Sequence, residues 1–423
     1  MTKNNDARAT RVLLLTQYFP PEPYPQTLWL AEALRGEGLA VRVLTSVPNY
    51  PTGKVLPGYR GFKLQREEVS SFSVTRVPVY PSHSTDAVGR IVNYGSFGLS
   101  AMATSRSALS TADVVLVWAT PATVGLPALV ESHLSGTPYI LYVQDLWPDS
   151  IFASGFLGSP KTRSLAERSL QPLLSSMYSN AAHIVAISPG MEKELVGRGV
   201  SKEHCTHIYN WVDEDMLSPR DPNGMLRQTL GLSKSHYLMA YAGNIGTAQG
   251  LGPWVEAMAR LPSDSPAHLV FIGDGSDKRN LERQVSDRGL LNVHFLPSVP
   301  ADQLADVLAD VDVLAISLAD QDLFRITMPS KLQACLALGK PVVAAVAGDA
   351  REVIMEANAG WLAEPEDVVS ILAAVLESQA AGGDEREGRG RSGRSFYENH
   401  MSKTVGSKAM ADLVASAAKR GLR

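Results

Sequence analysis

The sequence has few cysteines and no excess of basic residues, and each of these features excludes a class of protein. Its 423 residues include only two cysteines, Cys205 and Cys335, and neither has metal-ligand neighbours. This pattern indicates a reducing compartment and packing roles for both thiols. The 39 lysines and arginines against 43 aspartates and glutamates give a net charge of −4. Without a basic field, we expect no nucleic-acid partner.

The sequence also lacks the patterns of a membrane span and of a secretory leader. No window reaches the ~18 uninterrupted apolar residues that a spanning helix needs. The polar start MTKNNDARAT, residues 1–10, runs directly into an apolar, strand-like segment and does not resemble a signal peptide. We therefore predict a cytoplasmic location, with contact to the inner face of the membrane left open.

Several catalytic and cofactor-binding fingerprints are missing. The glycine-containing loop at residues 243–250, GNIGTAQG, fits neither GxGxxG nor GxxxxGK[ST]. This disfavours a nicotinamide dehydrogenase and an ATPase. No Ser-His-Asp spacing, nucleophile elbow or cluster of metal ligands stands out, so hydrolysis by those routes has no support.

What the sequence does contain is a regular alternation of apolar strands and helical segments. The expected strands cover residues 11–19, 41–46, 74–79, 113–118, 138–144 and 183–188, and then 237–242, 268–272, 292–296, 312–317 and 341–346. Such alternation indicates parallel βαβ units in open α/β sheets. The chain is long enough for two such domains. The predicted fold class is α/β, with two doubly wound Rossmann-like domains.

The domain boundaries follow from changes in composition. We predict a first domain over residues 1–213 and a second over 225–399, joined by the polar segment SPRDPNG at 218–224. The charged, glycine-rich run from Ala381, AGGDEREGRGRSGRS, is predicted to be flexible. A last helix over about 400–423 is expected to pack back on the first domain.

Glycine turns follow two predicted strands of the second domain, at the edge where open α/β sheets bind ligands. The first turn supplies Gly243, Asn244, Gly246 and Gln249, and the second supplies Gly273, Asp274 and Gly275. Glycines let the backbone approach a phosphate, although a tight turn is an equally natural reason for them. Asp274 suits a ligand hydroxyl, or simply an Asp-Gly turn. The pair Asp310 and Asp312 is interpreted as a helix-to-strand junction rather than a metal motif.

Polar residues also follow two strands of the first domain. Asp145 stands at the end of a buried strand, where a carboxylate can take part in chemistry or bind a sugar hydroxyl. Beside it, Trp147 offers an apolar plate for a sugar ring. The alternatives are that Asp145 caps the next turn and that Trp147 is a core residue. The loop at 47–53, VPNYPTG, presents polar tips with little reason to be buried.

A third kind of signal lies in the stretch 324–343, FRITMPSKLQACLALGKPVV. Pro329 and Ser330 suit the start of a helix, and Gly339 suits its end. Two cations, Arg325 and Lys331, flank the helix N-terminus, where backbone N–H groups favour an anion. The stretch is thus either a diphosphate site or an ordinary helix-strand unit with two solvated charges.

The order of these motifs resembles glycosyltransferase family 4, the retaining GT-B enzymes, and looks most like its fucosamine-transferase-like bacterial polysaccharide subgroup. The resemblance runs over nearly the whole chain and is carried by QYFPPEP (17–23), SVPNYPTGKV (46–55), VQDLWPDS (143–150), AISPGM (186–191), YNWVD (209–213), YAGNIGTAQGL (241–251), IGDGSD (272–277), MPSKL (328–332) and ALGKPVVA (337–344).

The resemblance implies a GT-B fold, with two domains facing a central cleft and a nucleotide-sugar donor on the second domain. It also implies retaining transfer to a glycan, glycolipid or small-molecule acceptor without a bound metal or other cofactor. The implied donor-site residues are those of the two glycine turns together with Pro329, Ser330, Gln333 and Asp349. The implied acceptor-side residues are Asn49, Tyr50, Gln144 and Trp147, and Asp145 would orient the acceptor or stabilise positive charge on the donor ring.

Three departures from the family affect the donor site. The loop after the first strand, PPEPYPQT, has no glycine, so backbone N–H groups of Gln26 or Thr27 would have to face a phosphate. The usual Arg and Lys after the second domain's first strand are replaced by the uncharged Asn244 and Gln249. The usual pair of glutamates falls at Ile326 and Ala334.

A diphosphate buried without a cation would be poorly stabilised. We therefore predict that Arg325 and Lys331 replace the missing cations, and that Gln333 or Asp349 takes some of the hydroxyl contacts. Two other classes remain open: a nucleotide-sugar epimerase or hydrolase on the same fold, and a non-catalytic donor-binding partner. The donor sugar, with an N-acetylated hexosamine or a deoxyhexosamine as candidates, is not fixed by the sequence.

Overall fold

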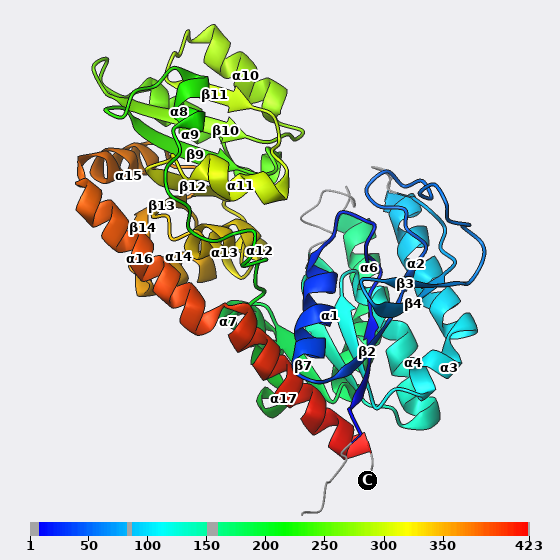
Figure 1. The fold of residues 1–423 in the computed structure, drawn as a ribbon. Coiled ribbons are helices and arrows are strands. Elements are labelled where there is room, and N and C mark those ends of the chain that lie inside the picture. Colours follow the sequence, from blue (N-terminus) through cyan, green and yellow to red (C-terminus); the bar gives the residue numbers. More distant parts are fainter. Residues whose placement is uncertain (1–7, 83–86, 150–159, 422–423) are drawn as a thin grey trace, which may run out of the picture. The chain divides into compact units, whose positions relative to one another are not determined.

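The computed structural model describes residues 8–82, 87–149 and 160–421, with their side chains except at 87–88, 160–167 and 169. Ser150 of the VQDLWPDS motif and the first seven residues lie outside the described residues. The chain forms two compact units, residues 1–208 with 406–423 and residues 209–405, each with its own sheet (Figure 1). No described helix is both long and apolar enough to cross a membrane.

The first unit is built on an eight-stranded sheet of order β3-β4-β2-β1-β5-β6-β7-β8. All pairings are parallel except that of β3 with β4. The strands are β1 Arg11–Leu15, β2 Ala40–Ser46, β3 Gln65–Val69, β4 Phe72–Val77, β5 Val114–Ala119, β6 Tyr139–Val143, β7 His183–Ala186 and β8 Cys205–His207. The helices are α1 Gln26–Gly36, α2 Ala87–Thr104, α3 Arg106–Ser110, α4 Leu126–Ser135, α6 Pro160–Asn180 and α7 Pro189–Gly197, with short 3₁₀ turns η1 Ala122–Gly125 and η2 Lys202–His204.

The second unit is built on a six-stranded, all-parallel sheet of order β11-β10-β9-β12-β13-β14. Its strands are β9 Tyr237–Ala242, β10 Ala267–Ile272, β11 Val293–Leu296, β12 Val313–Ser317, β13 Val342–Ala345 and β14 Gly360–Ala363. Its helices are α8 Met225–Leu230, η3 Thr247–Gln249, α9 Gly252–Ala259, α10 Lys278–Asp287, α11 Ala301–Leu308, α12 Asp322–Arg325, α13 Ser330–Ala337, α14 Asp349–Glu356, α15 Val368–Ala380 and α16 Gly383–His400.

The sheet of the second unit is buried on both faces, as its continuous apolar strands predict. Successive residues of β9 alternate between two separate apolar clusters: Leu238 and Ala240 belong to one, and Met239 and Tyr241 to the other. Helices α13, α14 and α16 complete the first cluster, and α9, α10 and α15 complete the second. The predicted α/β fold with two Rossmann-like sheets is thus confirmed.

In each sheet the strand order reverses at one point, where the chain stops adding strands on one side of its first strand and begins to add them on the other. In the first unit this point lies between β1 and β5, and in the second between β9 and β12. Open α/β sheets bind ligands outside the carboxyl ends of the strands at such a switch point. The loops after these four strands are therefore where ligand-binding residues are expected.

The charged run that begins at Ala381 was predicted to be flexible, and this prediction is wrong. Residues 383–400 form the helix α16. Pairs at i, i+4 join Arg389 to Glu385 and Arg394 to Glu398. Its glycines contact the neighbouring backbone closely, since a Cβ on Gly390 would lie 2.2 Å from the carbonyl oxygen of Gly339. The glycines that suggested flexibility are thus a packing surface, and α16 contacts α13 through it.

The predicted linker at 218–224 belongs to the second unit, which begins at Tyr209. Asp310 anchors it, because the Asp310 carboxylate accepts hydrogen bonds from the backbone N–H groups of Asn223, Gly224 and Leu226. Asp312 pairs with Arg227 at 2.7 Å. Both aspartates therefore serve a structural junction, as interpreted from the sequence.

The last helix, α17 Lys403–Gly421, begins in the second unit, and its residues from Gly406 onward belong to the first. There the Ser407 hydroxyl donates to the Glu37 carboxylate at 2.7 Å.

Candidate functional site

The two glycine turns of the second unit lie against each other at the switch point. A Cβ on Gly273 would lie 2.0 Å from the carbonyl oxygen of Gly243, and one on Gly275 would lie 2.2 Å from that of Ile245. The Ile245 N–H donates to the Asp274 carbonyl at 2.8 Å. Only glycine permits this approach of two backbones, so the glycines predicted as donor-binding residues form one continuous surface.

Lys331 lies directly beside this surface. It is the second residue of α13, and its Nζ stands 5.2 Å from the centre of the Tyr241 ring at the end of β9. A Cβ on Gly243 would lie 2.7 Å from the Lys331 Cε. Its side chain is largely buried, and no ion pair joins it to a carboxylate in the described part of the chain. Burial lowers the pKa of Lys331, with the Cys335 thiol partly opposing this shift.

Arg325, the other predicted cation, has a different environment. It ends α12, and its guanidinium pairs with Asp320 at 2.7 Å and approaches Asp322 at 3.9 Å. Its side chain is 49% exposed. A diphosphate at this position would compete with two carboxylates, whereas Lys331 needs no such exchange. The structure thus distinguishes two cations that the sequence treats alike.

Asn244 and Gln249, at the positions where many relatives carry Arg and Lys, are bonded to each other. The Asn244 amide donates to the Gln249 Oε1 at 3.3 Å, and the Gly246 N–H donates to the same oxygen at 3.1 Å. The Tyr241 hydroxyl donates to the Asn244 carbonyl at 2.7 Å. These uncharged side chains therefore fix the shape of the loop.

The remaining predicted donor residues line the start of α13 and α14. Pro329 precedes α13, and Ser330 is its exposed first residue without a side-chain cap. Gln333 is buried, and its Nε2 has no hydrogen-bond partner among the described residues. Asp349 is buried at the first position of α14, after Gly348, whose Cβ would clash with the Arg325 carbonyl. Asp274 uses its carboxylate in the Asp-Gly turn, accepting from the Gly275 N–H at 2.8 Å.

In the first unit, Asp145 lies at the equivalent edge of the sheet. It follows β6, and the Thr120 hydroxyl after β5 donates to its Oδ2 at 3.1 Å. Burial raises the pKa of Asp145, while the Thr120 hydrogen bond opposes the shift. The negative charge of Asp145 also acts on two nearby phenols, Tyr24 and Tyr94. Asp145 is thus a carboxylate near two phenols that accepts a hydrogen bond from the Thr120 hydroxyl.

A second buried carboxylate, Glu22, lies in the glycine-free loop after β1. It accepts the backbone N–H groups of Asn49 and Tyr50, both at 2.9 Å, and that of Phe19 at 3.2 Å. The fully buried Arg76 donates to the Pro20 carbonyl of the same loop and pairs with Glu67. The Glu22 carboxylate and the Arg76 guanidinium therefore anchor the backbone of this loop.

Glu22 makes the stability of the protein depend on pH. Burial raises its pKa to about 7 from the ordinary 4.5, against the lowering effect of its backbone hydrogen bonds and of Arg76. Because the folded state keeps a proton that the unfolded state has lost, the free energy of unfolding falls as pH rises from about 4.5 to about 7. We expect a difference of about 3 kcal/mol from this group.

Urea melts of the wild type and of Glu22→Gln at pH 5 and pH 8 test this expectation. The wild type should lose more stability between the two pH values than the variant does. Equal pH dependence in both proteins would contradict it.

The acceptor-side residues predicted from the sequence are more buried than expected. Asn49 was predicted to be a polar tip with little reason to be buried, and this is wrong: it is 2% exposed and bonded to Asn93 and to the Val47 carbonyl. Trp147 is 7% exposed and packs against Ala122 and Leu174 in a small core cluster. This packing agrees with the alternative interpretation of Trp147 as a core residue. Gln144 is buried, while Tyr50 is half-buried, with its ring 5.2 Å from that of Tyr18.

Sequence reasoning missed several members of this group. Tyr18, Tyr24 and Tyr94 surround the loops near Asp145, and Tyr24 accepts a hydrogen bond from the Trp118 indole at 3.1 Å. The signal for Glu22 and Tyr24 was present in PPEPYP, a polar and aromatic segment directly after a buried strand. Tyr94 lies inside a helix, and only the packing of α2 brings it to Tyr18.

The described residues contain no group of three or more His, Cys, Asp or Glu side chains that could hold a metal ion. The first unit brings together carboxylate, phenol and hydroxyl groups around Asp145. The second unit places the largely buried Lys331 beside the two glycine turns. Such groups can position sugar hydroxyls and an anionic leaving group.

Comparison with known families gives two matches on this chain. Residues 24–211 match the model described as "Glycosyl transferase 4-like domain", and residues 236–379 match that described as "Glycosyl transferases group 1". The second match falls within the second compact unit, and the first lies in the first unit except for residues 209–211.

Similar proteins and structures agree with these matches. A putative colanic acid biosynthesis glycosyl transferase, WcaI of Escherichia coli, is 28% identical over 82% of this chain and 86% of its own length. A probable glycosyltransferase, WbjE of Pseudomonas aeruginosa, is 26% identical over 67% and 70%.

Among solved structures, HepE of Anabaena in complex with UDP and glucose has a TM-score of 0.69 at 16% identity, over 96% of this chain and 100% of that one. Sucrose-phosphate synthase of Thermosynechococcus elongatus has a TM-score of 0.72 at 17% identity, over 97% and 99%. With both family models matched in order and two Rossmann-like units, the chain belongs to the glycosyltransferases of the GT-B fold.

Proposed function

We propose that the protein transfers a sugar from a nucleotide-sugar donor to a glycan, glycolipid or small-molecule acceptor, with retention, in the synthesis of cell-surface polysaccharide. The donor sugar is proposed to be an N-acetylated hexosamine or a deoxyhexosamine, and the reaction to take place in the cytoplasm. The observation that carries the proposal is the largely buried Lys331 at the start of α13, which has no carboxylate partner among the described residues and lies beside Gly243 and the second unit's switch point. Similarity to WcaI, a putative colanic acid biosynthesis glycosyl transferase, and to HepE, whose structure contains UDP and glucose, supports the substrate class.

The chemistry follows from charge. Departure of the nucleoside diphosphate leaves negative charge on its phosphates, and a desolvated cation with helix N–H groups stabilises it strongly. We propose that Lys331 performs this role without a resident metal or other cofactor, with Gly243 and Gly273 letting backbone approach the phosphates. Arg325 is proposed as a second cation that exchanges its pair with Asp320 for the ligand. Gln333, whose Nε2 has no partner in the described part of the chain, is proposed to donate to an oxygen of the donor.

On the acceptor side, Asp145 is proposed to orient the acceptor or to stabilise positive charge on the sugar ring. With retention, the acceptor proton can pass to the departing phosphate, so Asp145 need not act as a general base. Thr120 holds its carboxylate in place.

Incubation with a panel of UDP-, GDP- and TDP-sugars, with and without lipid-linked acceptors, tests the proposal. We expect nucleotide release only when an acceptor is present, and NMR of the product should show the anomeric configuration of the donor. Release without acceptor would favour a hydrolase, and a free isomerised donor would favour an epimerase. Donor binding without turnover would favour a non-catalytic partner.

Contact with a membrane is proposed through helix α2. The helix buries Phe97 and Ala101, yet Ile91, Val92 and Leu99 are exposed, Leu99 to 66%. These three positions share one face, since they lie at helical spacing. An apolar stripe of this kind opposite the buried face suits a lipid surface. The first residue of the next helix, Arg106, lies 3.8 Å from the Glu131 carboxylate, so the apolar stripe carries the proposal without help from its charge.

Co-sedimentation with vesicles of phosphatidylethanolamine and phosphatidylglycerol tests this contact. The Ile91→Asp, Leu99→Asp double variant should lose at least 10-fold in vesicle binding. Leu291→Asp, which changes an 88% exposed leucine of the second unit, should bind as the wild type does. Equal binding by all three proteins would contradict the proposal.

A further inference from the structure

A pocket lined by arginines lies at the opposite edge of the first unit's sheet from Asp145. It is formed at the amino ends of β1 and β2, with a cavity volume of about 650 Å³. Four arginines, Arg8, Arg11, Arg35 and Arg42, contribute to it. We refer to these residues with Ser107 and Thr111 as the arginine pocket. Parallel strands share their amino ends at one edge, and five residues of β1 span roughly 17 Å, so the pocket is separate from the Asp145 group.

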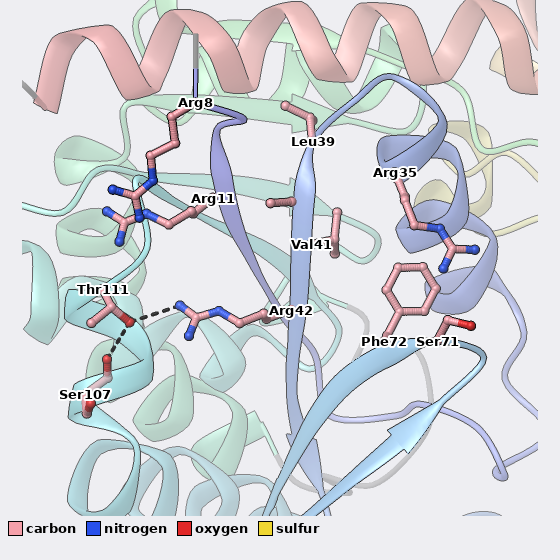
Figure 2. A pocket seen from close by; sticks show the side chains of 11 residues that line it. Arg8, Arg11, Arg35, Leu39, Val41, Arg42, Ser71, Phe72, Ser107 and Thr111 are labelled. Atoms are coloured by element: carbon pink, nitrogen blue, oxygen red, sulfur yellow. Dashed lines mark hydrogen bonds between the residues drawn. The ribbon is translucent and has the colours of Figure 1, made fainter. Parts of the chain in front are cut away.

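Three of the four arginines lie on the same side of β2. Figure 2 shows Arg8, Arg11 and Arg42 on the side of β2 where Ser107 and Thr111 lie, with Arg35 on the other side beside Phe72. Arg11 is held by the Asp113 carboxylate, with its Nη2 at 2.6 Å from Oδ1. Arg42 donates to the Thr111 hydroxyl at 2.9 Å, and that hydroxyl donates to the Ser107 carbonyl at 2.7 Å. Two of the three arginines are therefore fixed in direction before any ligand arrives.

The positive charge of this cluster exceeds the negative charge beside it. Asp113 is the carboxylate that pairs with the cluster, and hydrogen bonds from Arg11 lower its pKa, with a smaller contribution from the charge of Arg8. Neither Arg8 nor Arg42 forms an ion pair with a carboxylate in the described residues. Arg35 lies 4.3 Å from the centre of the Phe72 ring and donates to the Ser70 carbonyl. In a chain of net charge −4, this is a local surplus of cations.

We propose that the arginine pocket is a second ligand site, which binds a small organic molecule carrying a diphosphate or two phosphates. Planar guanidinium groups bind phosphate oxygens bidentately, and three arginines on the same side of one pocket favour a ligand with several negative charges. The Ser107 hydroxyl can supply a further hydrogen bond, while the Thr111 hydroxyl, which donates to the Ser107 carbonyl, positions Arg42. Leu39, which is partly exposed just before β2, adds an apolar contact for the uncharged part of such a molecule. The volume suits a ligand of nucleotide size.

Isothermal titration calorimetry with inorganic pyrophosphate tests the site, using the full chain. Because pyrophosphate also suits the proposed donor site, the reference protein is Lys331→Ala. We expect this protein to bind pyrophosphate, and the addition of Arg8→Ala with Arg42→Ala to weaken that binding at least 10-fold. The addition of Arg283→Ala, an exposed arginine on α10, should leave it unchanged.

Thr111→Glu gives an independent test, because it removes no arginine and places a carboxylate opposite Arg42 on an exposed position. Combined with Lys331→Ala, Thr111→Glu should abolish pyrophosphate binding. As a single substitution in the wild-type chain, it should leave UDP binding unchanged. Absence of binding to Lys331→Ala, or equal binding in the presence and absence of Arg8 and Arg42, would overturn the proposal. The proposal would also be overturned if the Arg8 and Arg42 substitutions reduced binding to anionic vesicles while no protein bound pyrophosphate, because the cluster would then recognise a membrane surface.

Discussion

Replacing Lys331 with alanine should lower the rate constant of sugar transfer by about 100-fold or more, the usual effect of removing one preorganised group from a developing anion. The stability of the folded protein should not fall, because the wild-type ammonium is buried without a carboxylate partner in the described residues, and its removal relieves a desolvation cost. Steady-state kinetics and thermal melts of the same preparations measure the two effects. Unchanged turnover would remove Lys331 from the mechanism.

Lys340 provides a matched control. It is also largely buried and follows the same helix, α13, but its Nζ donates to the carbonyls of Ala309 and Val311 at 2.6 and 2.9 Å. Lys340→Ala leaves these carbonyls without their donor, and we expect a loss of about 1–3 kcal/mol of stability with an unchanged rate constant per folded molecule. The two lysines should therefore have opposite effects on rate and stability.

Replacing Asp145 with asparagine should lower the rate constant by about 100-fold with little change in stability. The amide keeps the shape and an oxygen for the Thr120 hydroxyl, but it loses the charge that the proposed role requires. Because burial raises the pKa of Asp145, the wild-type rate should begin to fall on acidification at a higher pH than an exposed aspartate would give. The variant should lack this acidic limb.

Asp149→Asn is the control for Asp145→Asn. Asp149 lies four residues further along and pairs with Arg198 at 2.7 Å. Its loss breaks an ion pair, and neither the rate constant nor the acidic limb should change. A pH profile of Asp145→Asn that matches the wild type would show that the charge of Asp145 has no part in the reaction.

Much of the fold follows from local patterns. The buried strands β1, β5, β6, β9 and β12 were predicted because parallel strands covered on both faces need continuous apolar runs. The strands that were missed, β3, β8 and β14, are short or lie at the edges of the sheets. The exposed positions of β3, QREEV, carry charges that resemble those of a loop. Helix α16 was missed for a related reason, since glycine and charge favour flexibility until a neighbouring helix packs against the glycines.

For the candidate site, some features follow from the local sequence and others depend on tertiary packing. The sequence alone determined that glycine turns and a proline-started helix follow the strands of the second unit, because turn chemistry and strand order are local properties. It could not determine which of two nearby cations is available, since that depends on Asp320, which pairs with Arg325, and on Gly243, which lies against Lys331. Likewise, only tertiary packing places Glu22 beneath Asn49 and gathers Arg8, Arg11 and Arg42 in one pocket. Burial and charge pairing are properties of neighbours distant in the chain, and these decide what a polar side chain can do.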